Sequence, residues 1–365
     1  MESPKPKQSD KPVVSKKTPL LEAKTPEALP IIFECSLSPG DIVCMTAGVR
    51  DLHKNFPGVY KTDVRGSCKE LWEHNRYITK IDDDGVVVSG SDQEIRDGVK
   101  DAWAKGNVPK VKLEYPLIHS SNEGPNHFTE GYTDHLERIL SIRIRDRMMR
   151  GHIELSDDEK SWISQVQEIT GADTYYWIVV SGGKYDFTAK WWDPVRMQRV
   201  VSSLKELMFV QVGESDHYHP KLIGDNVIDL IGKTDMRMLI RLVYHSSGII
   251  CPVTLLMHLA AAVPVRNEKC YNRMNRPCVV IAGGREGSSW EAYCNHAYLH
   301  TCGMLDCCDN GGCWKSRVLA LDDDDEKNNS LCLKPRLTEN GITIPACLKM
   351  IEVGDVVRAV RKYLP

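Results

Sequence analysis

A carboxylate, Asp41, stands where an apolar strand gives way to a helix. Residues 31–37 read as a buried strand, Ser38-Pro39-Gly40 as a turn, and residues 42–55 have amphipathic helical spacing. Here Asp41 can cap the helix, a contact that stabilises a helix by about 1 kcal/mol. It can also act as a general base if the turn borders a ligand cleft, since glycine lets a ligand approach the backbone closely. The sequence leaves both roles open.

A lysine in the second half of the chain has the chemistry to complement that base. Lys190 lies in the run Ala-Lys-Trp-Trp-Asp-Pro, before a predicted helix over residues 195–207. Its ammonium can stabilise the negative charge that develops on a diphosphate leaving group. The alternative is a solvated lysine at the start of a helix.

Polar and glycine-rich turns follow three predicted strands of the second half. Ser181-Gly182-Gly183 ends the strand over 175–180, and its backbone N–H groups suit phosphate oxygens. Glu214 and Asp216 follow the strand over 209–213, where carboxylates commonly accept hydrogen bonds from ribose hydroxyls, so either is a candidate. The turn Gly232-Lys233-Thr234 follows the next strand. Because ligands of α/β proteins bind at the carboxyl ends of parallel strands, these turns are predicted to line one nucleotide site.

Three further residues are candidates for the acceptor side of such a site. His127 and Tyr132 follow a polar loop over residues 119–128, and loops of that length are often functional. His127 can equally serve only to pin the loop. Arg285 follows the buried strand over 277–284, where it can face a phosphate or an acceptor carboxylate, or occupy a surface turn.

Seven of the thirteen cysteines fall after residue 293. The spacing of Cys308, Cys313, Cys332 and Cys347 gives a short chelate and two remote ligands, a pattern typical of structural tetrathiolate sites. Cys302 or Cys307 is an alternative to Cys308. Thiolates suit zinc and iron, so the metal stays open, and buried free thiols are the other interpretation.

The order of these elements predicts an α/β protein. Strands and helices alternate, which favours parallel sheets covered by helices, and 365 residues suffice for two domains. The expected divisions are a disordered tail over 1–30, a first domain over 31–165, a second domain over 166–293, a cysteine-rich metal module over 294–350 and a C-terminal helix over 351–365.

The composition limits the classes of partner that the protein can be expected to bind. The net charge is −3 and charges of both signs are mixed along the chain, which argues against nucleic-acid binding. The sequence has no apolar run of membrane-spanning length, and its amino terminus has no apolar signal segment. We therefore expect a cytoplasmic protein, a compartment in which clustered cysteines favour metal binding over disulfides.

Three motifs in order resemble those of the glycosyltransferase family 9 heptosyltransferases. Ser38-Pro39-Gly40-Asp41 followed by Phe56-Pro57-Gly58 resembles the amino-terminal signature, and Lys190-Trp191-Trp192 resembles the family's K-x-W segment. The run from the strand ending at Gly213 through Asp229-Leu230-Ile231-Gly232-Lys233-Thr234 to His258-Leu259-Ala260-Ala261-Ala262 resembles the donor-binding half. Together the three cover about 250 residues.

The resemblance implies a GT-B-like fold, with two Rossmann-type domains facing a cleft, and an inverting sugar transfer. Asp41 would be the base and Lys190 would face the diphosphate. Thr254 and His258 would contact the donor, which would be ADP-heptose or a close relative, and no catalytic metal is expected. The family's acid and glycine before this helix are replaced by Val253 and Leu255, which leaves the sugar open. In such transferases the last helix crosses back to the first domain.

The acceptor is expected to be a hydroxyl on a glycan, a protein or a small molecule, and the chain is a possible homo-oligomer. A subgroup, the bacterial autotransporter heptosyltransferases, has a similar four-cysteine iron finger. Two other interpretations remain: a non-catalytic, metal-stabilised scaffold that keeps the fold, favoured by Val253, and a sugar-nucleotide epimerase.

Overall fold

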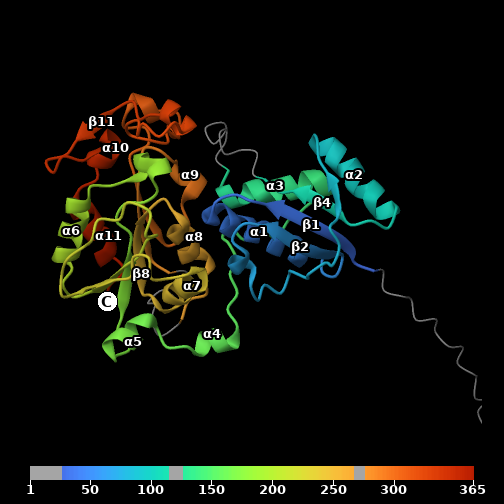
Figure 1. The fold of residues 1–365 in the computed structure, drawn as a ribbon, viewed down its shortest axis with the longest axis horizontal. Coiled ribbons are helices and arrows are strands. Elements are labelled where there is room, and N and C mark those ends of the chain that lie inside the picture. Colours follow the sequence, from blue (N-terminus) through green and yellow to red (C-terminus); the bar gives the residue numbers. More distant parts are fainter. Residues whose placement is uncertain (1–26, 115–125, 267–275) are drawn as a thin grey trace, which may run out of the picture.

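The computed structural model describes residues 27–114, 126–266 and 276–365. Two parallel sheets, each covered by helices, form two lobes (Figure 1). Most of the predicted tail over 1–30, and loop residues 119–125, lie outside the described residues. The predicted α/β class with two parallel-sheet domains is confirmed.

The first sheet has four parallel strands in the order β2-β1-β4-β3. Its central strand β1 carries Ile31, Ile32 and Phe33, all fully buried, as expected for a strand covered on both faces. Its strands are β1 (Leu29–Cys35), β2 (Tyr60–Gly66), β3 (Val86–Val88) and β4 (Pro109–Lys112). Its helices are α1 (Pro39–Asn55), η1 (Lys69–Trp72), α2 (Asp92–Ala104) and α3 (Phe128–Leu140).

The second sheet has six parallel strands in the order β10-β9-β8-β5-β6-β7. The strands are β5 (Tyr176–Val179), β6 (Met208–Gln211), β7 (Val227–Asp229), β8 (Gly248–Pro252), β9 (Cys278–Gly283) and β10 (His296–His300). The helices of this half are α4 (Asp157–Ser161), α5 (Gln165–Thr170), η3 (Tyr185–Lys190), α6 (Pro194–Ser203), α7 (Met236–His245), α8 (Leu255–Ala262) and α9 (Ser288–Glu291).

The two lobes share a packed seam. Figure 1 shows α1 and α8 facing each other there, and one cluster of buried apolar side chains runs from the first sheet into the second. The fit is close: a β-carbon on Gly40, in the first turn of α1, would lie 3.0 Å from Cδ2 of His258 in α8. Any ligand at this seam is therefore held between elements of both lobes.

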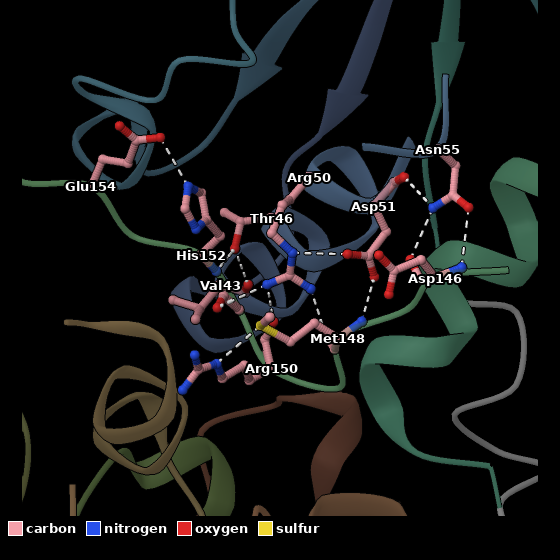
Figure 2. A network of polar contacts seen from close by, with 11 residues as sticks. Val43, Thr46, Arg50, Asp51, Asn55, Asp146, Met148, Arg150, His152 and Glu154 are labelled. Carbon is pink, nitrogen blue, oxygen red and sulfur yellow. Dashed lines mark hydrogen bonds and ion pairs between the residues drawn. The ribbon is translucent and has the colours of Figure 1, made fainter. Parts of the chain in front are cut away.

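The connection between the lobes is held by a buried arginine. Arg50 of α1 is 2% exposed, and its guanidinium donates to the Asp51 carboxylate and to the carbonyls of Met148, Arg150 and Gly151 (Figure 2). Asp51 in turn accepts the Met148 N–H at 3.1 Å. The segment that leaves the first lobe is thus fixed to the helix that carries Asp41.

Two predictions for the C-terminal part are wrong: the residue at which the cysteine-rich segment begins, and the lobe on which the last helix packs. Residues 296–300 form β10, the edge strand of the second sheet, so the cysteine-rich segment begins after residue 300 rather than at 294. The last helix, α11 (Val353–Arg361), packs on α6, β9 and β10 and does not cross to the first lobe. Its apolar face is already covered by second-lobe residues such as Val200 and Val279.

The segment after β10 is built from short elements. They are η5 (Asp306–Cys308), η6 (Glu326–Asn329), the antiparallel pair β11 (Pro335–Leu337) and β12 (Thr343–Pro345), and α10 (Ala346–Lys349). Its acidic run folds around Arg317, which is 1% exposed and ion-paired with Asp323 and Asp325. In the described part of the chain, no helix has both the length and the apolar character needed to cross a membrane.

Candidate active site

Asp41 lies in the first turn of α1 at the seam. The N-cap of α1 is Ser38, not Asp41 as the sequence suggested; Asp41 is the third helical residue, and its Oδ2 accepts the Ser38 N–H at 3.0 Å in a capping box. The side chain is also close enough to Glu291 of α9 to raise the pKa of that carboxyl. This helix-end contact leaves the Asp41 carboxyl able to act electrostatically on a residue of the second lobe.

Lys190 ends η3 and points at a buried carboxylate. Its Nζ lies 2.9 Å from Oε1 of Glu286, which also takes an ion pair from Arg285. Arg285 is 7% exposed, and its Nε donates to the Lys315 carbonyl at 2.6 Å. The guanidinium that was predicted to face an acceptor is thus engaged within the second lobe.

Both predicted catalytic residues influence a third group, the buried carboxyl of Glu291. It is 4% exposed, and its pKa is raised well above the usual value, first by burial and then by Glu286. Lys190 lowers this pKa and Asp41 raises it. Residues from both lobes therefore act electrostatically on one buried carboxyl group.

Around Glu291 the seam is filled by polar and aromatic side chains. His258 Nδ1 is 2.7 Å from the Tyr293 hydroxyl, Cys44 Sγ is 3.4 Å from each of these atoms, and His258 Nε2 is 3.7 Å from Glu291 Oε2. Burial lowers the pKa of His258 to about 3, which keeps the imidazole neutral at neutral pH. We call these four residues the seam cluster.

Several polar atoms at the seam have no hydrogen-bond partner among the described residues. They are Oε2 of Glu286 and Glu291, Nε1 of Trp290, and both ring nitrogens of His296. Leaving such a buried group unpaired costs about 1–3 kcal/mol, so native structures keep few of them. Such atoms also occur elsewhere in the described residues, for example Nε1 of Trp72 and Oε1 of Gln165, so at the seam they show that polar side chains are buried there.

The two acceptor-side candidates at and in α3 are both buried. His127 caps α3 through Nδ1 and stands edge-on to Tyr293, with the ring centroids 4.9 Å apart. Burial lowers its pKa to about 4. Tyr132 is fully buried in the core against α1, so it does not line the seam.

The predicted donor residues lie together at the carboxyl ends of β5 to β8, as the strand rule requires. Ser181 and Gly182 line a small cavity with Trp192, Met197 and Pro252. The Ser181 hydroxyl is buried and, within the described residues, unpaired. Glu214, Gly232 and Lys233 are exposed, and Thr234 and Thr254 are half-buried; Thr254 occupies the N-cap position of α8 without a side-chain capping bond.

Some of the backbone groups predicted to meet phosphate are already used. The Gly183 N–H donates to the Tyr218 carbonyl at 2.9 Å, and the Gly232 N–H donates to the Gly213 carbonyl at 2.8 Å. Gly182 has φ +99°, and a β-carbon there would clash with the Tyr218 carbonyl oxygen. This glycine therefore shapes the turn.

Five cysteines line one cavity in the C-terminal segment. The four predicted ligands Cys308, Cys313, Cys332 and Cys347 all face it, together with Cys307. Burial raises the pKa of Cys347 to about 11, and the neighbouring thiols add to the shift. A cation in the cavity would reverse that effect and favour thiolates.

The spacing of these sulfurs is wider than that of a loaded site. In the described residues no three cysteine sulfurs lie within 4.8 Å of one another. Metal–sulfur bonds of about 2.3 Å require sulfurs roughly 3.8 Å apart. The donor chemistry therefore fits zinc or iron, and binding requires the thiols to draw together.

One group of possible metal ligands in the described residues does have its ligand atoms within 4.8 Å of one another: Glu73, His74 and Glu159. Here Glu159 is already bonded to Arg237 Nη2 at 2.6 Å. The group is therefore part of a set of ion pairs that connects the residues after η1 with α4 and α7.

Sequence reasoning missed Cys44, Glu286, Glu291 and Tyr293. A usable signal existed for Glu286, because it follows the glycine pair at the end of a buried strand, where ligands of α/β sheets bind. The sequence contains no comparable signal for Cys44 or Tyr293, because these residues meet only when the two lobes pack.

No protein-family model and no curated protein sequence matches the chain. Solved structures do. A family 9 glycosyltransferase from Veillonella parvula matches with a TM-score of 0.59 at 14% identity, over 94% of this chain and 99% of that one. The ADP-heptose LPS heptosyltransferase II of E. coli matches with a TM-score of 0.52 at 14% identity, over 92% and 98%.

A third match is TibC of enterotoxigenic E. coli, described as an iron-containing dodecameric glycosyltransferase. Its TM-score is 0.54 at 15% identity, over 92% of this chain and 76% of that one. The matches span both lobes of the present structure. The chain therefore has the GT-B-like, two-domain fold of the family 9 glycosyltransferases.

Proposed function

We propose that the protein is an inverting glycosyltransferase that moves a sugar from a nucleoside diphosphate to an acceptor hydroxyl. The observation that carries this proposal is that Asp41, from the first lobe, and Lys190, from the second, both act electrostatically on the buried carboxyl group of Glu291. A base and a cation supplied by opposite lobes are what a direct displacement between two bound substrates needs.

In the proposed reaction Asp41 accepts the proton of the acceptor hydroxyl. The hydroxyl oxygen forms a bond to the anomeric carbon as the bond from that carbon to the diphosphate oxygen breaks. The electron pair leaves with the diphosphate, and Lys190 stabilises the charge that develops there. Attack from the face opposite the leaving group inverts the anomeric centre.

The donor is proposed to lie along the carboxyl ends of β5 to β8. The buried, unpaired Ser181 hydroxyl and the Thr254 end of α8 are placed to meet the diphosphate, and exposed Glu214 is placed to meet a ribose. Similarity to heptosyltransferase II supports ADP-heptose as the donor. A glycan, a protein side chain or a small molecule can supply the acceptor hydroxyl.

We further propose a structural zinc or iron held by Cys308, Cys313, Cys332 and Cys347. The shared cavity and the iron content of TibC support this. When bound, the metal would act as a cross-link between η5, α10 and the loops that carry Cys313 and Cys332. The thiols suit a reducing compartment, in which we place the protein.

A ligand screen tests the nucleotide part. Thermal unfolding of the purified chain is followed with ADP, UDP, GDP and ADP-heptose, and metal content is measured on the same sample. We expect ADP and ADP-heptose to raise the melting temperature most. If no nucleoside diphosphate shifts the transition, the proposal fails.

One observation favours a non-catalytic scaffold as the second candidate. The acid expected before α8 is Val253, and His258 is packed against Tyr293 and Cys44 instead of facing open space. A scaffold could bind a nucleotide but would release no ADP from ADP-heptose. Measuring ADP release separates the two functions.

A further inference from the structure

We propose that Glu286 is a positioning residue that holds the Lys190 ammonium at the seam. This inference rests on the proposed function, because the place of Lys190 matters to transfer only if a diphosphate leaves beside it.

The ion pair joins a partly exposed cation to a buried anion. Lys190 Nζ and Glu286 Oε1 are 2.9 Å apart, and the two side chains are 24% and 3% exposed. The carboxylate thus lies beneath the lysine and leaves part of it accessible. A bound diphosphate would approach Lys190 from the accessible side.

Glu286 is itself fixed. Arg285 pairs with the same carboxylate, and its guanidinium is held by the Lys315 carbonyl and lies 5.4 Å from the centres of the Phe187 and Trp314 rings. A carboxylate anchored in this way has one orientation. It therefore gives the flexible Lys190 side chain one preferred end point.

The charge balance also favours positioning. Burial raises the pKa of Glu286, but Arg285 and Lys190 outweigh it, so the net shift is downward and the group is ionised. An ionised acid here reduces the attraction for a diphosphate. Its retention next to Lys190 is explained if the orientation of the ammonium matters more than the net charge.

Only one of the two carboxylate oxygens of Glu286 takes part in these ion pairs. Oε2 of Glu286 is buried and has no hydrogen-bond partner among the described residues. A carboxylate placed only for stability would bond through both oxygens, because an unpaired buried acceptor is costly. The arrangement satisfies the oxygen that faces Lys190.

The first test needs no substrate. The full-length protein is labelled with trace acetic anhydride, and acetylation of each lysine is quantified by peptide mass spectrometry. In Glu286→Gln we expect Lys190 labelling to rise by about threefold, because the amine loses its partner. Lys184, exposed at the start of η3, is the internal control. Unchanged Lys190 labelling overturns the inference.

The second test separates positioning from folding. Glu286→Gln should bind ADP as tightly as wild type, or up to about threefold tighter, because a negative charge is gone. Its kcat for ADP release from ADP-heptose should fall about 100-fold, the scale of a displaced catalytic group. Parallel losses in ADP binding and kcat would mean a merely structural role and overturn the inference.

Two further variants complete the design. Glu286→Asp keeps the negative charge but moves it away from Lys190 Nζ, so its kcat should fall while its ADP affinity stays unchanged. This variant tests the positioning role if Glu286→Gln does not fold. Glu352→Gln removes an exposed acid paired with Arg196 and should behave as wild type. A wild type that binds no ADP contradicts the proposed function, whereas the labelling result stands on its own.

Discussion

The ammonium of Lys190 is the charge on which leaving-group stabilisation depends in this account. We expect Lys190→Met to raise the Kd for ADP by about tenfold or more, a loss of at least about 1.4 kcal/mol. Lys184→Met removes the same charge six residues earlier, at an exposed position, and should change Kd by less than about twofold. Calorimetric titration with ADP measures both, and equal effects would show that Lys190 has no special place.

Neutral histidines at the seam predict a loss of stability in acid. The folded pKa of His258 is about 3 and that of His127 about 4, both below the ordinary 6.5. The unfolded chain therefore binds protons first as the pH falls below 6.5. The free energy of unfolding should fall from pH 6.5 towards pH 4, by up to about 1.4 kcal/mol per pH unit for each histidine.

His258→Gln isolates one of these contributions. Denaturant unfolding at pH 7 and pH 5 should show a smaller acid loss in this variant than in wild type, by about 1–2 kcal/mol. His300→Gln, at the exposed end of β10, should keep the wild-type difference. Glu291 has a raised pKa, so its contribution to the free energy of unfolding is lost as the pH rises, opposite to that of the histidines. The comparison of variants is therefore needed to isolate the histidine contribution.

At the scale of elements, α1 carries both the candidate base and the arginine that holds the connection between lobes. Arg50→Met would remove the cation that pairs with the buried Asp51 carboxylate and the donor to the carbonyl groups of Met148 and Arg150 (Figure 2). We expect a loss of about 3–5 kcal/mol in the free energy of unfolding. Arg76→Met removes a 70% exposed ion pair with Glu154 and should cost less than about 1 kcal/mol. A similar small cost for Arg50→Met would contradict the structural role.

The cysteine-lined segment is the element whose stability should depend on metal. We expect about one zinc or iron per chain in protein purified without chelator. Its removal should lower the melting temperature. Cys313→Ser with Cys332→Ser should abolish metal retention, whereas Cys294→Ser, outside the cavity, should not. Elemental analysis and thermal unfolding check this; wild type purified without metal, or a double variant that melts at the temperature of metal-loaded wild type, would contradict it.

The elements that the sequence predicts well are those with strong local patterns. Apolar runs followed by glycine located β5, β6 and β9, an apolar run ending in proline located β8, and the strand rule brought the donor candidates to one edge. The boundary at 294 failed because His296-Ala-Tyr-Leu-His is short and only half-buried at a sheet edge. The last helix was misplaced because its packing partner depends on a long-range choice that amphipathic spacing does not encode.

The same distinction holds for the site. Asp41 and Lys190 could be identified from local motifs, each with a chemical role. The seam cluster could not, since Cys44 and Tyr293 are 249 positions apart and meet only through the packing of α1 on the second lobe. Arg285 and Tyr132 were given acceptor roles because burial is not visible in a single sequence.

At the scale of the whole molecule, the two lobes share one apolar core and close over a polar seam. The central claim is that this seam transfers a sugar, with Asp41 as the base. Asp41→Asn tests the claim well, because the amide oxygen can still accept the Ser38 N–H and keep the cap. Glu94→Gln makes the equivalent change in the capping box of α2 and serves as the control.

The deciding measurement is the rate of ADP release from ADP-heptose by wild type, Asp41→Asn and Glu94→Gln, with matched circular dichroism spectra. The account predicts that Asp41→Asn loses about 10²–10⁴ in kcat while ADP affinity stays the same, and that Glu94→Gln is unaffected. Release by Asp41→Asn at the wild-type rate, or no release by wild type, would contradict it.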